Sequence, residues 1–286
     1  MIPLIFLHPA APLDLTRPSI HWSTVIGLLV LAAIYWGRTR VLGGTSGGAP
    51  SPSRQSAFGA ALLIIFASLN GPIHDLSDYY LFSAHMVQHL LLTLVAAPLM
   101  VFGLTGEMLR PLLRSRAVAA VARAVTRPAI CYAIFNVVII FWHLPFAYNA
   151  AMANHGIHIL QHLTLLAASV LMWWPLMSPL PELPRLPYPG QMLYCFLMVI
   201  PMSVVAIYIA MADTILYSAY AAAPRIWNLT PMTDQHIGGL IMWIPGGLFF
   251  YGIMTVVFFR WASRGEDTRE AAQVDWVPNL PGPVRR

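Results

Sequence analysis

The same short motif, H-x-x-Q-H-L, occurs twice in apolar stretches of this chain. The first copy, HMVQHL, contains His85 and His89, and the second, HILQHL, contains His158 and His162. Residues four apart on a helix stack on one face, with Cβ atoms about 5 to 6 Å apart, so each pair could chelate one ion. Two such helices packed face to face would bring four imidazoles together, enough for a tetrahedral metal site or for two adjacent ions.

Further side chains are expected near the same level and could add ligands or guide an ion. These candidates are His143, His155, His74, His236, Met86 and Asp75. Gln88 and Gln161 each precede the second histidine of a pair, and we expect them to fix an imidazole tautomer through a hydrogen bond. His8 and His21 are interpreted as ordinary hydrogen-bonded histidines near a helix end.

The donor types in the sequence favour copper as the bound metal. Cys131 and Cys195 lie inside apolar stretches without a CxxC spacing, so neither a disulfide framework nor a thiolate metal site is indicated. An imidazole-rich site suits copper or zinc, and copper binds most tightly among the first-row divalent ions. A thioether such as that of Met86 would favour Cu(I). We therefore expect copper, ahead of zinc, iron or haem.

Helices that cross a membrane must position these residues. Of the 286 residues 58% are hydrophobic and only 9% are charged, where a soluble domain carries roughly 25% charged residues. Apolar stretches of about 18 to 24 residues can each cross a bilayer as a helix. The predicted fold is all-α and polytopic, with about seven transmembrane helices. The predicted spans are 20–36, 57–70, 80–103, 129–147, 154–177, 191–212 and 236–260.

The arginines predict the orientation of these spans. The chain has no lysine, and all its arginines except Arg17 and Arg225 fall on one side of the predicted spans. Cytoplasmic loops retain positive charge, so the N-terminus is expected outside and the C-terminus in the cytoplasm. The predicted parts are an external segment (1–19), a transmembrane domain (20–262) and a poorly ordered cytoplasmic tail (263–286), with a surface helix within 107–125. All ten histidines then fall at or near the outer face.

The formal charge of +5 does not indicate nucleic-acid binding, because the arginines lie beside apolar spans and no basic cluster is interleaved with aromatics. The expected surroundings are a lipid bilayer.

Four segments in order resemble the caa3-type cytochrome c oxidase assembly factor family (Bacillus-type CtaG). They are HMVQHLLLTLVAAPLMVFG, FWHLPFAYNAA, HILQHLTLLAASVLMWWPLMSP and GGLIMWIPGG, and the resemblance covers roughly residues 55 to 262. The resemblance implies a non-enzymatic assembly factor for haem-copper oxidases in the bacterial cytoplasmic membrane. It also implies copper delivery to an oxidase subunit or a periplasmic copper chaperone, and oxidase subunits as partners.

Three other interpretations of the histidines stay open. A histidine-box di-metal membrane oxidoreductase would hold two irons and turn over with oxygen. A membrane cytochrome with bis-histidine b-type haem would show a Soret band. A structural partner without metal would copurify with an oxidase while remaining metal-free.

Overall fold

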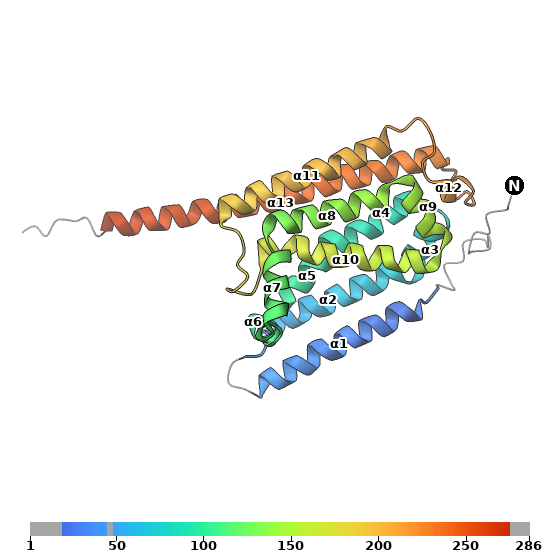
Figure 1. Cartoon of the computed structure of the whole chain (residues 1–286). Coiled ribbons are helices and arrows are strands. Elements are labelled where there is room, and N and C mark those ends of the chain that lie inside the picture. Colours follow the sequence, from blue (N-terminus) through green and yellow to red (C-terminus); the bar gives the residue numbers. More distant parts are fainter. Residues whose placement is uncertain (1–18, 45–47, 275–286) are drawn as a thin grey trace, which may run out of the picture.

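The long helices of the chain lie side by side in one bundle (Figure 1). A computed structural model describes residues 19–44 and 48–274, and within these residues all regular structure is helical, as the all-α prediction requires. The helices are α1 (Trp22–Gly43), α2 (Pro52–Leu69), α3 (Gly71–Tyr79), α4 (Phe82–Leu90), the π-helix η1 (Leu91–Ala96), α5 (Ala97–Gly103), α6 (Gly106–Leu109), the 3-10 helix η2 (Arg110–Arg114), α7 (Arg116–Val125), α8 (Pro128–His143), α9 (Pro145–Ala153), α10 (His155–Met177), α11 (Tyr188–Ala210), α12 (Ser218–Ala221) and α13 (Pro231–Val274).

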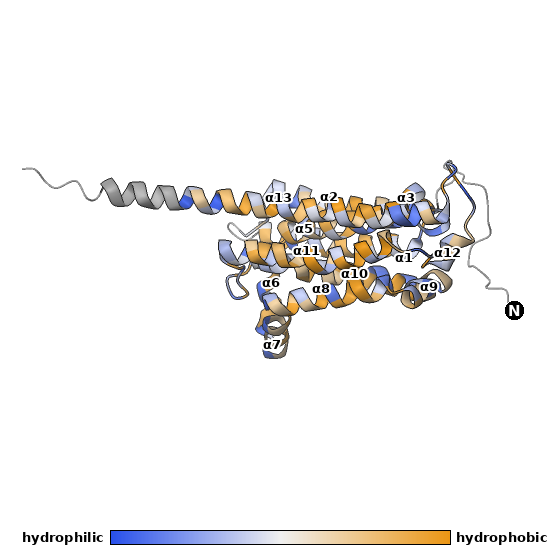
Figure 2. Ribbon diagram, turned by 90° about the horizontal axis from the view of Figure 1, so that it is seen from above, coloured by the Kyte–Doolittle hydropathy of each residue, from blue (hydrophilic) through white to orange (hydrophobic). Residues whose placement is uncertain are grey.

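Five helices among the described residues are long and apolar enough to cross a membrane. They are α1, the span Phe82–Gly103 that joins α4, η1 and α5, then α10, α11, and α13 as far as Arg264. Two bent pairs, α2 with α3 at 42° and α7 with α8 at 72°, raise the number to seven if each pair is one span. Figure 2 shows hydrophobic residues along the long helices and hydrophilic residues gathered toward their ends. The chain is therefore a polytopic helical membrane protein.

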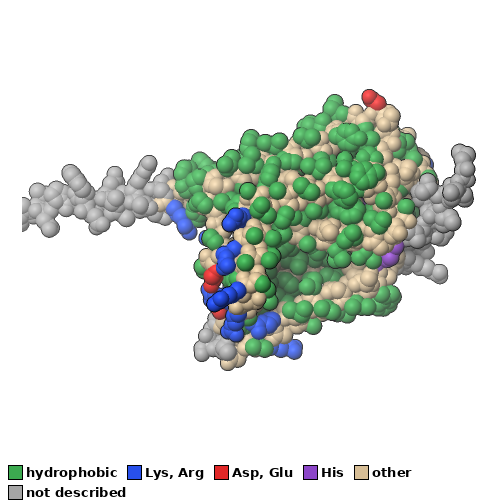
Figure 3. Space-filling view, viewed as in Figure 1, with side chains coloured by type: hydrophobic (Ala, Val, Ile, Leu, Met, Phe, Trp, Pro, Cys, Tyr) green, Lys and Arg blue, Asp and Glu red, His purple; other side chains and the backbone are tan. Residues whose placement is uncertain are grey.

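The two ends of the bundle differ in chemistry. One end, here called the histidine end, carries His21, His74, His85, His89, His143, His155, His158 and His162. The opposite end, the arginine end, carries Arg110, Arg114, Arg116 and Arg123 around η2 and α7. Figure 3 shows basic side chains gathered at one end of the bundle and a histidine at the other. Helices α4 and α10 both begin at the histidine end, so the two H-x-x-Q-H-L motifs enter the bundle in the same direction.

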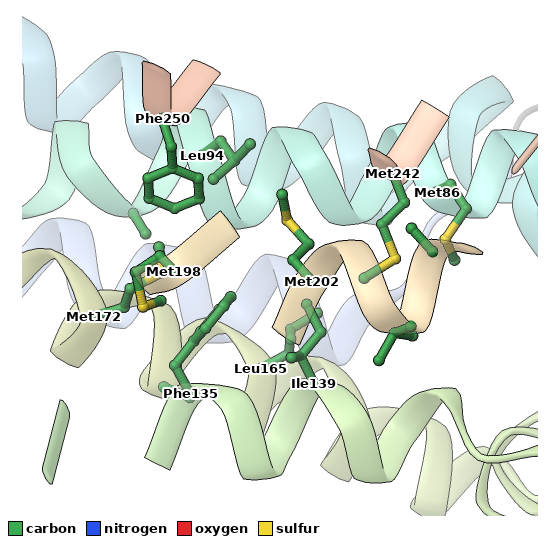
Figure 4. Packing of buried hydrophobic residues seen from close by; sticks show 14 of the residues in the cluster. Met86, Leu94, Phe135, Ile139, Leu165, Met172, Met198, Met202, Met242 and Phe250 are labelled. Atoms are coloured by element: carbon green, nitrogen blue, oxygen red, sulfur yellow. The ribbon is translucent and has the colours of Figure 1, made fainter. Parts of the chain in front are cut away.

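The hydrophobic core lies between α4, α8, α10, α11 and α13. Leu165, Met198 and Phe250 are among its most deeply buried side chains (Figure 4). Helices α11 and α13 approach closely at Gly239, where an added Cβ would lie 2.7 Å from the backbone nitrogen of Ala210. A small residue is required there because close backbone approach substitutes for side-chain packing between membrane helices.

Helix α1 is peripheral. Only Tyr35 and Thr39 of this helix are buried, and Tyr35 stacks on Phe58 of α2 with ring centroids 3.9 Å apart. At the histidine end, the amide of His21 donates to the Asn70 side chain at 2.7 Å, so the start of α1 is fastened to the corner between α2 and α3. Gly71 forms that corner at a φ of 69°, a left-handed conformation that favours glycine.

The predicted tail needs a correction. We expected a poorly ordered chain from residue 263, but α13 continues as a helix to Val274, and the remaining residues 275–286 lie outside the described residues. The run EDTREAAQV contains strong helix formers and no glycine or proline, which explains why the apolar helix extends into a polar segment. His8 also lies outside the described residues.

Candidate metal centre

The four histidines of the repeated motif lie close together. Within α4 the ring centroids of His85 and His89 are 4.2 Å apart, and within α10 those of His158 and His162 are 4.6 Å apart. Between the helices, His162 lies 6.1 Å from His85 and 6.0 Å from His89, and His85 lies 6.4 Å from His158. The two pairs therefore face each other rather than lipid, which is the geometry that a shared metal ion needs.

These four imidazoles are buried, with between 0% and 8% of each residue exposed. Both ring nitrogens of His85 and His89, and Nδ1 of His162, have no hydrogen-bond partner within the part of the chain that the structure describes. Buried polar groups without a partner are rare in folded proteins, because each costs about 1 to 3 kcal/mol. A metal ion bound between the rings would satisfy several of these nitrogens at once.

His143 adds a fifth imidazole from the end of α8. Its centroid lies 5.5 Å from that of His89. Its Nδ1 lies 2.7 Å from the Ile139 carbonyl oxygen, which can only accept, so Nδ1 carries the proton. Nε2 of His143 is then left with its lone pair, buried and without a partner among the described residues. A neutral ring held in this way presents a ligand nitrogen, as metal-binding histidines commonly do.

Distant residues set the position of the α4 histidines. The residue before α4 is Leu81, which has no capping side chain, and Asp234 of α13 takes over this role. The Asp234 carboxylate accepts hydrogen bonds from the amides of Phe82, at 2.6 Å, and Ser83, at 3.2 Å. The π-helix η1 begins directly after this histidine turn, and π-helical turns are often found at functional sites.

Local capping positions the α10 histidines. The Asn154 side chain accepts a hydrogen bond from the amide of Ile157 at 3.1 Å and so fixes the first turn of α10. Asparagine is among the residues most favoured at this capping position. His158 and His162 follow on the inward face, where their Nε2 atoms lie 2.7 Å apart.

A second layer of histidines lies toward the end of the bundle. The His74 ring on α3 is 6.0 Å from that of His158 and 4.2 Å from that of His21. His155 is exposed, and its ring lies 6.1 Å from that of His21. Burial lowers the pKa of His21, and nearby His155 lowers it further, while the Asp75 carboxylate opposes this shift. We interpreted His21 as an ordinary hydrogen-bonded histidine near a helix end, and its Nε2 does lie 3.5 Å from the Ser19 hydroxyl. Its ring also lies within this row of rings.

Two of the additional candidates are hydrogen-bonded to other segments of the chain. Nε2 of His236 is 3.1 Å from the Ala212 carbonyl, so this residue joins α13 to the segment after α11 and not to the histidine cluster. Asp75 accepts hydrogen bonds from the amide and hydroxyl of Ser19, so its carboxylate holds the chain ahead of α1. In both cases the side chain is hydrogen-bonded to a segment that is distant in the sequence. Spacing along the sequence could not reveal such a contact.

Met86 is buried on α4 and faces the core instead of the second layer of histidines. It lines a cavity of about 10 Å³ together with Met202, Met242, His89 and His143. Figure 4 shows Met86, Met202 and Met242 among the same buried side chains. A cavity of this size has room for about one water-sized atom.

The two glutamines make other contacts than those we expected. The Gln88 amide nitrogen donates to the Ser68 carbonyl at 2.6 Å. Both polar atoms of the Gln161 side chain are buried without a hydrogen-bond partner among the described residues. Neither amide is therefore hydrogen-bonded to an imidazole here, and a role in fixing ring tautomers stays a prediction.

Sequence reasoning assigned Asp78 to a possible entry path for cations but not to a set of metal ligands, and it missed two tyrosines. The Asp78 carboxylate lies 3.4 Å from Nε2 of His74 and 3.5 Å from Nδ1 of His158. The spacing of four between His74 and Asp78 could have revealed their shared helical face. The hydroxyls of Tyr148 and Tyr220 are 2.7 Å apart, and Tyr220 donates to the Ser77 carbonyl, which closes the cluster on the side of α9 and α12.

Fold and site together define a polytopic helical membrane protein with a buried imidazole cluster near one end of its bundle. No curated protein and no solved structure matches the chain in the comparisons made. A family model matches residues 23–264, which is most of the sequence. The chain belongs to the cytochrome c oxidase caa3 assembly factor family.

Proposed function

We propose that this assembly factor holds copper at His85, His89, His158 and His162 and passes it to an oxidase subunit or to a periplasmic copper chaperone. Family membership supports the connection with oxidase assembly and a non-catalytic role. One observation carries the copper part. Two histidine pairs from separate helices face each other at about 6 Å, and several of their buried nitrogens have no hydrogen-bond partner among the described residues.

The donor set supports copper over other metals. Imidazoles without thiolate suit copper and zinc, and copper has the higher intrinsic affinity among the divalent ions. Thioethers bind soft Cu(I) in preference to Zn²⁺, and Met86, Met202 and Met242 line the small cavity beside His89 and His143. A protein that receives and releases copper would benefit from both kinds of donor.

The proposed location is the bacterial cytoplasmic membrane, with the histidine end facing outward. The arginines gathered at the opposite end support this orientation, because positive loops are retained in the cytoplasm. Copper held at the outward end would be accessible to a periplasmic chaperone or to an oxidase domain on that side.

The test is the copper content of protein purified from its native membrane with a histidine-free affinity tag. We expect wild-type protein to contain copper, and joint His85→Ala and His158→Ala substitution to remove it, because one ring is lost from each facing pair. His236→Ala is the matched control, since that ring contacts the Ala212 carbonyl and lies away from the cluster. Unchanged copper in the double variant would exclude these histidines as the copper site.

A second candidate function is a histidine-box di-metal oxidoreductase. Asp78 favours it, because a carboxylate beside the imidazoles of His74 and His158 resembles the two-histidine, one-carboxylate set of non-haem iron enzymes. Iron in the purified protein together with oxygen-dependent turnover would support this function. Copper without such turnover would support the assembly role.

A further inference from the structure

One group of donor atoms at the histidine end differs in chemistry from the four facing imidazoles. His74, Asp78 and His158 each offer a ligand atom, and these atoms all lie within 4.8 Å of one another. All three residues are buried. The group combines two imidazoles with a carboxylate, whereas the set formed by the repeated motif contains imidazoles alone.

We propose that His74, Asp78 and His158 form a second metal site, which takes a divalent transition-metal ion of the Zn²⁺ and Cu²⁺ class. Two imidazoles and a carboxylate are a common ligand set for Zn²⁺, with a fourth position open to water or an incoming ligand. The carboxylate also supplies a negative charge to a divalent ion in surroundings that solvate it poorly. The site therefore selects divalent ions more strongly than an all-imidazole set does.

The local structure of α3 prepares Asp78 for this role. His74 and Asp78 are four residues apart and so share one face of the helix. The Ser77 hydroxyl lies 3.0 Å from Oδ1 of Asp78 and 2.8 Å from the His74 carbonyl oxygen, so its one proton is shared between these acceptors and helps to position the carboxylate. The other oxygen, Oδ2, faces both rings, at 3.4 Å from His74 and 3.5 Å from His158. One oxygen is thus used for positioning and the other is directed at the proposed ion.

His158 connects this site to the facing imidazoles. Its Nδ1 lies on the Asp78 side, while its Nε2 lies 2.7 Å from Nε2 of His162. An ion at the proposed site is therefore one imidazole away from the copper-binding set, and ligand exchange along neighbouring rings could move it inward. A role as the first binding site for incoming metal rests on the proposed function. Binding of an ion by His74, Asp78 and His158 does not.

A cavity leads to the proposed site from outside the bundle. Its volume is about 570 Å³, and His74, Asp78 and His158 form part of its lining together with His21 and His155. The cavity lies between α1 and α10, where Figure 3 shows a hollow in the surface with a histidine near its edge. His162 of the facing set also lines this cavity, whereas the rings of His85 and His89 do not. The cavity therefore reaches the carboxylate site and one ring of the facing set.

Equilibrium dialysis of the full-length purified protein against Zn²⁺, followed by elemental analysis, tests the site. Zn²⁺ is a suitable probe because it has no redox chemistry. We expect two ions per wild-type chain and one in Asp78→Asn, since asparagine keeps the size of the side chain but loses its charge. Asp75→Asn is the matched control, because Asp75 lies three residues away and contacts Ser19. It should still bind two ions.

A second variant decides the question even if Asp78→Asn does not fold. Joint His85→Ala and His89→Ala substitution removes half of the facing set and leaves His74, Asp78 and His158 in place. We expect this variant to keep one Zn²⁺, with X-ray absorption showing two imidazoles and oxygen ligands around it. A metal-free variant, or an ion surrounded by imidazoles alone, would overturn the proposal, as would wild-type Zn²⁺ binding by a folded Asp78→Asn variant.

The two proposals fail separately in these measurements. If the Asp78→Asn variant binds one Zn²⁺ fewer but the wild-type protein purified from its membrane contains no copper, the carboxylate site is supported and the proposed copper function is excluded. If the copper content depends on His85 and His158 but Zn²⁺ binding is unchanged in Asp78→Asn, the copper function is supported and the carboxylate site is excluded.

Discussion

Single hydrogen bonds decide which nitrogen atoms in this cluster are available to a metal. The Ile139 carbonyl takes the Nδ1 proton of His143, so the free lone pair of that ring is on Nε2. His143 and His89 then border the small cavity that Met86, Met202 and Met242 also line. Nitrogen and sulfur donors around one atom-sized space are a combination that favours Cu(I) over Zn²⁺.

We predict that joint Met86→Leu and Met242→Leu substitution lowers Cu(I) affinity about tenfold, which corresponds to about 1.4 kcal/mol, and leaves Zn²⁺ affinity unchanged. Leucine replaces methionine with little change in volume, so the core should tolerate the exchange. Competition with a chromophoric Cu(I) chelator measures the first quantity, and Zn²⁺ titration measures the second. Met172→Leu, in the same core but outside the cavity lining, is the control. Equal Cu(I) affinities in the wild type, the double variant and Met172→Leu would mean that the thioethers of Met86 and Met242 contribute to core packing and do not bind the ion.

Among the helices, α4 depends most on a contact from far along the chain. Asp234 is buried in the first turn of α13, and its carboxylate accepts the amides of Phe82 and Ser83 at the start of α4. One carboxylate thus serves two helix N-termini, where the helix dipole favours negative charge. This contact holds the turn that carries His85 in place.

We predict that Asp234→Ala destabilises the protein by about 2 to 3 kcal/mol, because two buried amides lose a charged acceptor. The expected fall in Tm of the purified protein is roughly 5 to 10 °C. Asp213→Ala serves as the comparison, since Asp213 is exposed and surface changes of this kind cost at most about 0.5 kcal/mol. Identical melting of the two variants would show that α4 does not depend on this contact.

The sequence predicted features that depend on local spacing, and it missed those that depend on long-range contacts. Hydropathy located the helices, and the repeated motif identified two pairs of rings that the fold brings face to face. The cap from Asp234 could not be predicted, because 151 or more residues separate it from its partners. The π-helix after His89 was missed as well, since LLTLVA reads as ordinary apolar helix. The contact of His236 with the Ala212 carbonyl could not be predicted either, because Ala212 belongs to a segment whose path the sequence does not define.

Across the whole molecule, the arginine side chains of η2 and α7 and the histidine cluster lie at opposite ends of the bundle. At the arginine end, Arg110 pairs with Glu107 and with Glu182. A hydrogen bond from the backbone amide of Glu182 and a second one from Arg110 lower the pKa of the Glu182 carboxyl. The surplus of arginine there remains after this pairing, and such loops resist translocation across the membrane. At the histidine end, Tyr148 of α9 and Tyr220 of α12 close one side of the cluster, and the shared direction of α4 and α10 brings both motifs to that end.

This asymmetry predicts the orientation of the chain, and cysteine labelling of intact cells can test it. Cys131 and Cys195 are both buried, so the wild-type protein should give a low background with a membrane-impermeant maleimide. Ala222 at the histidine end and Ala117 at the arginine end are both exposed and differ from cysteine by little volume. We expect Ala222→Cys to be labelled in cells with a permeable outer envelope and an intact cytoplasmic membrane. Ala117→Cys should be labelled only after that membrane is opened. The reverse pattern would place the histidine cluster at the cytoplasmic face. From there the protein could not deliver copper to a periplasmic partner.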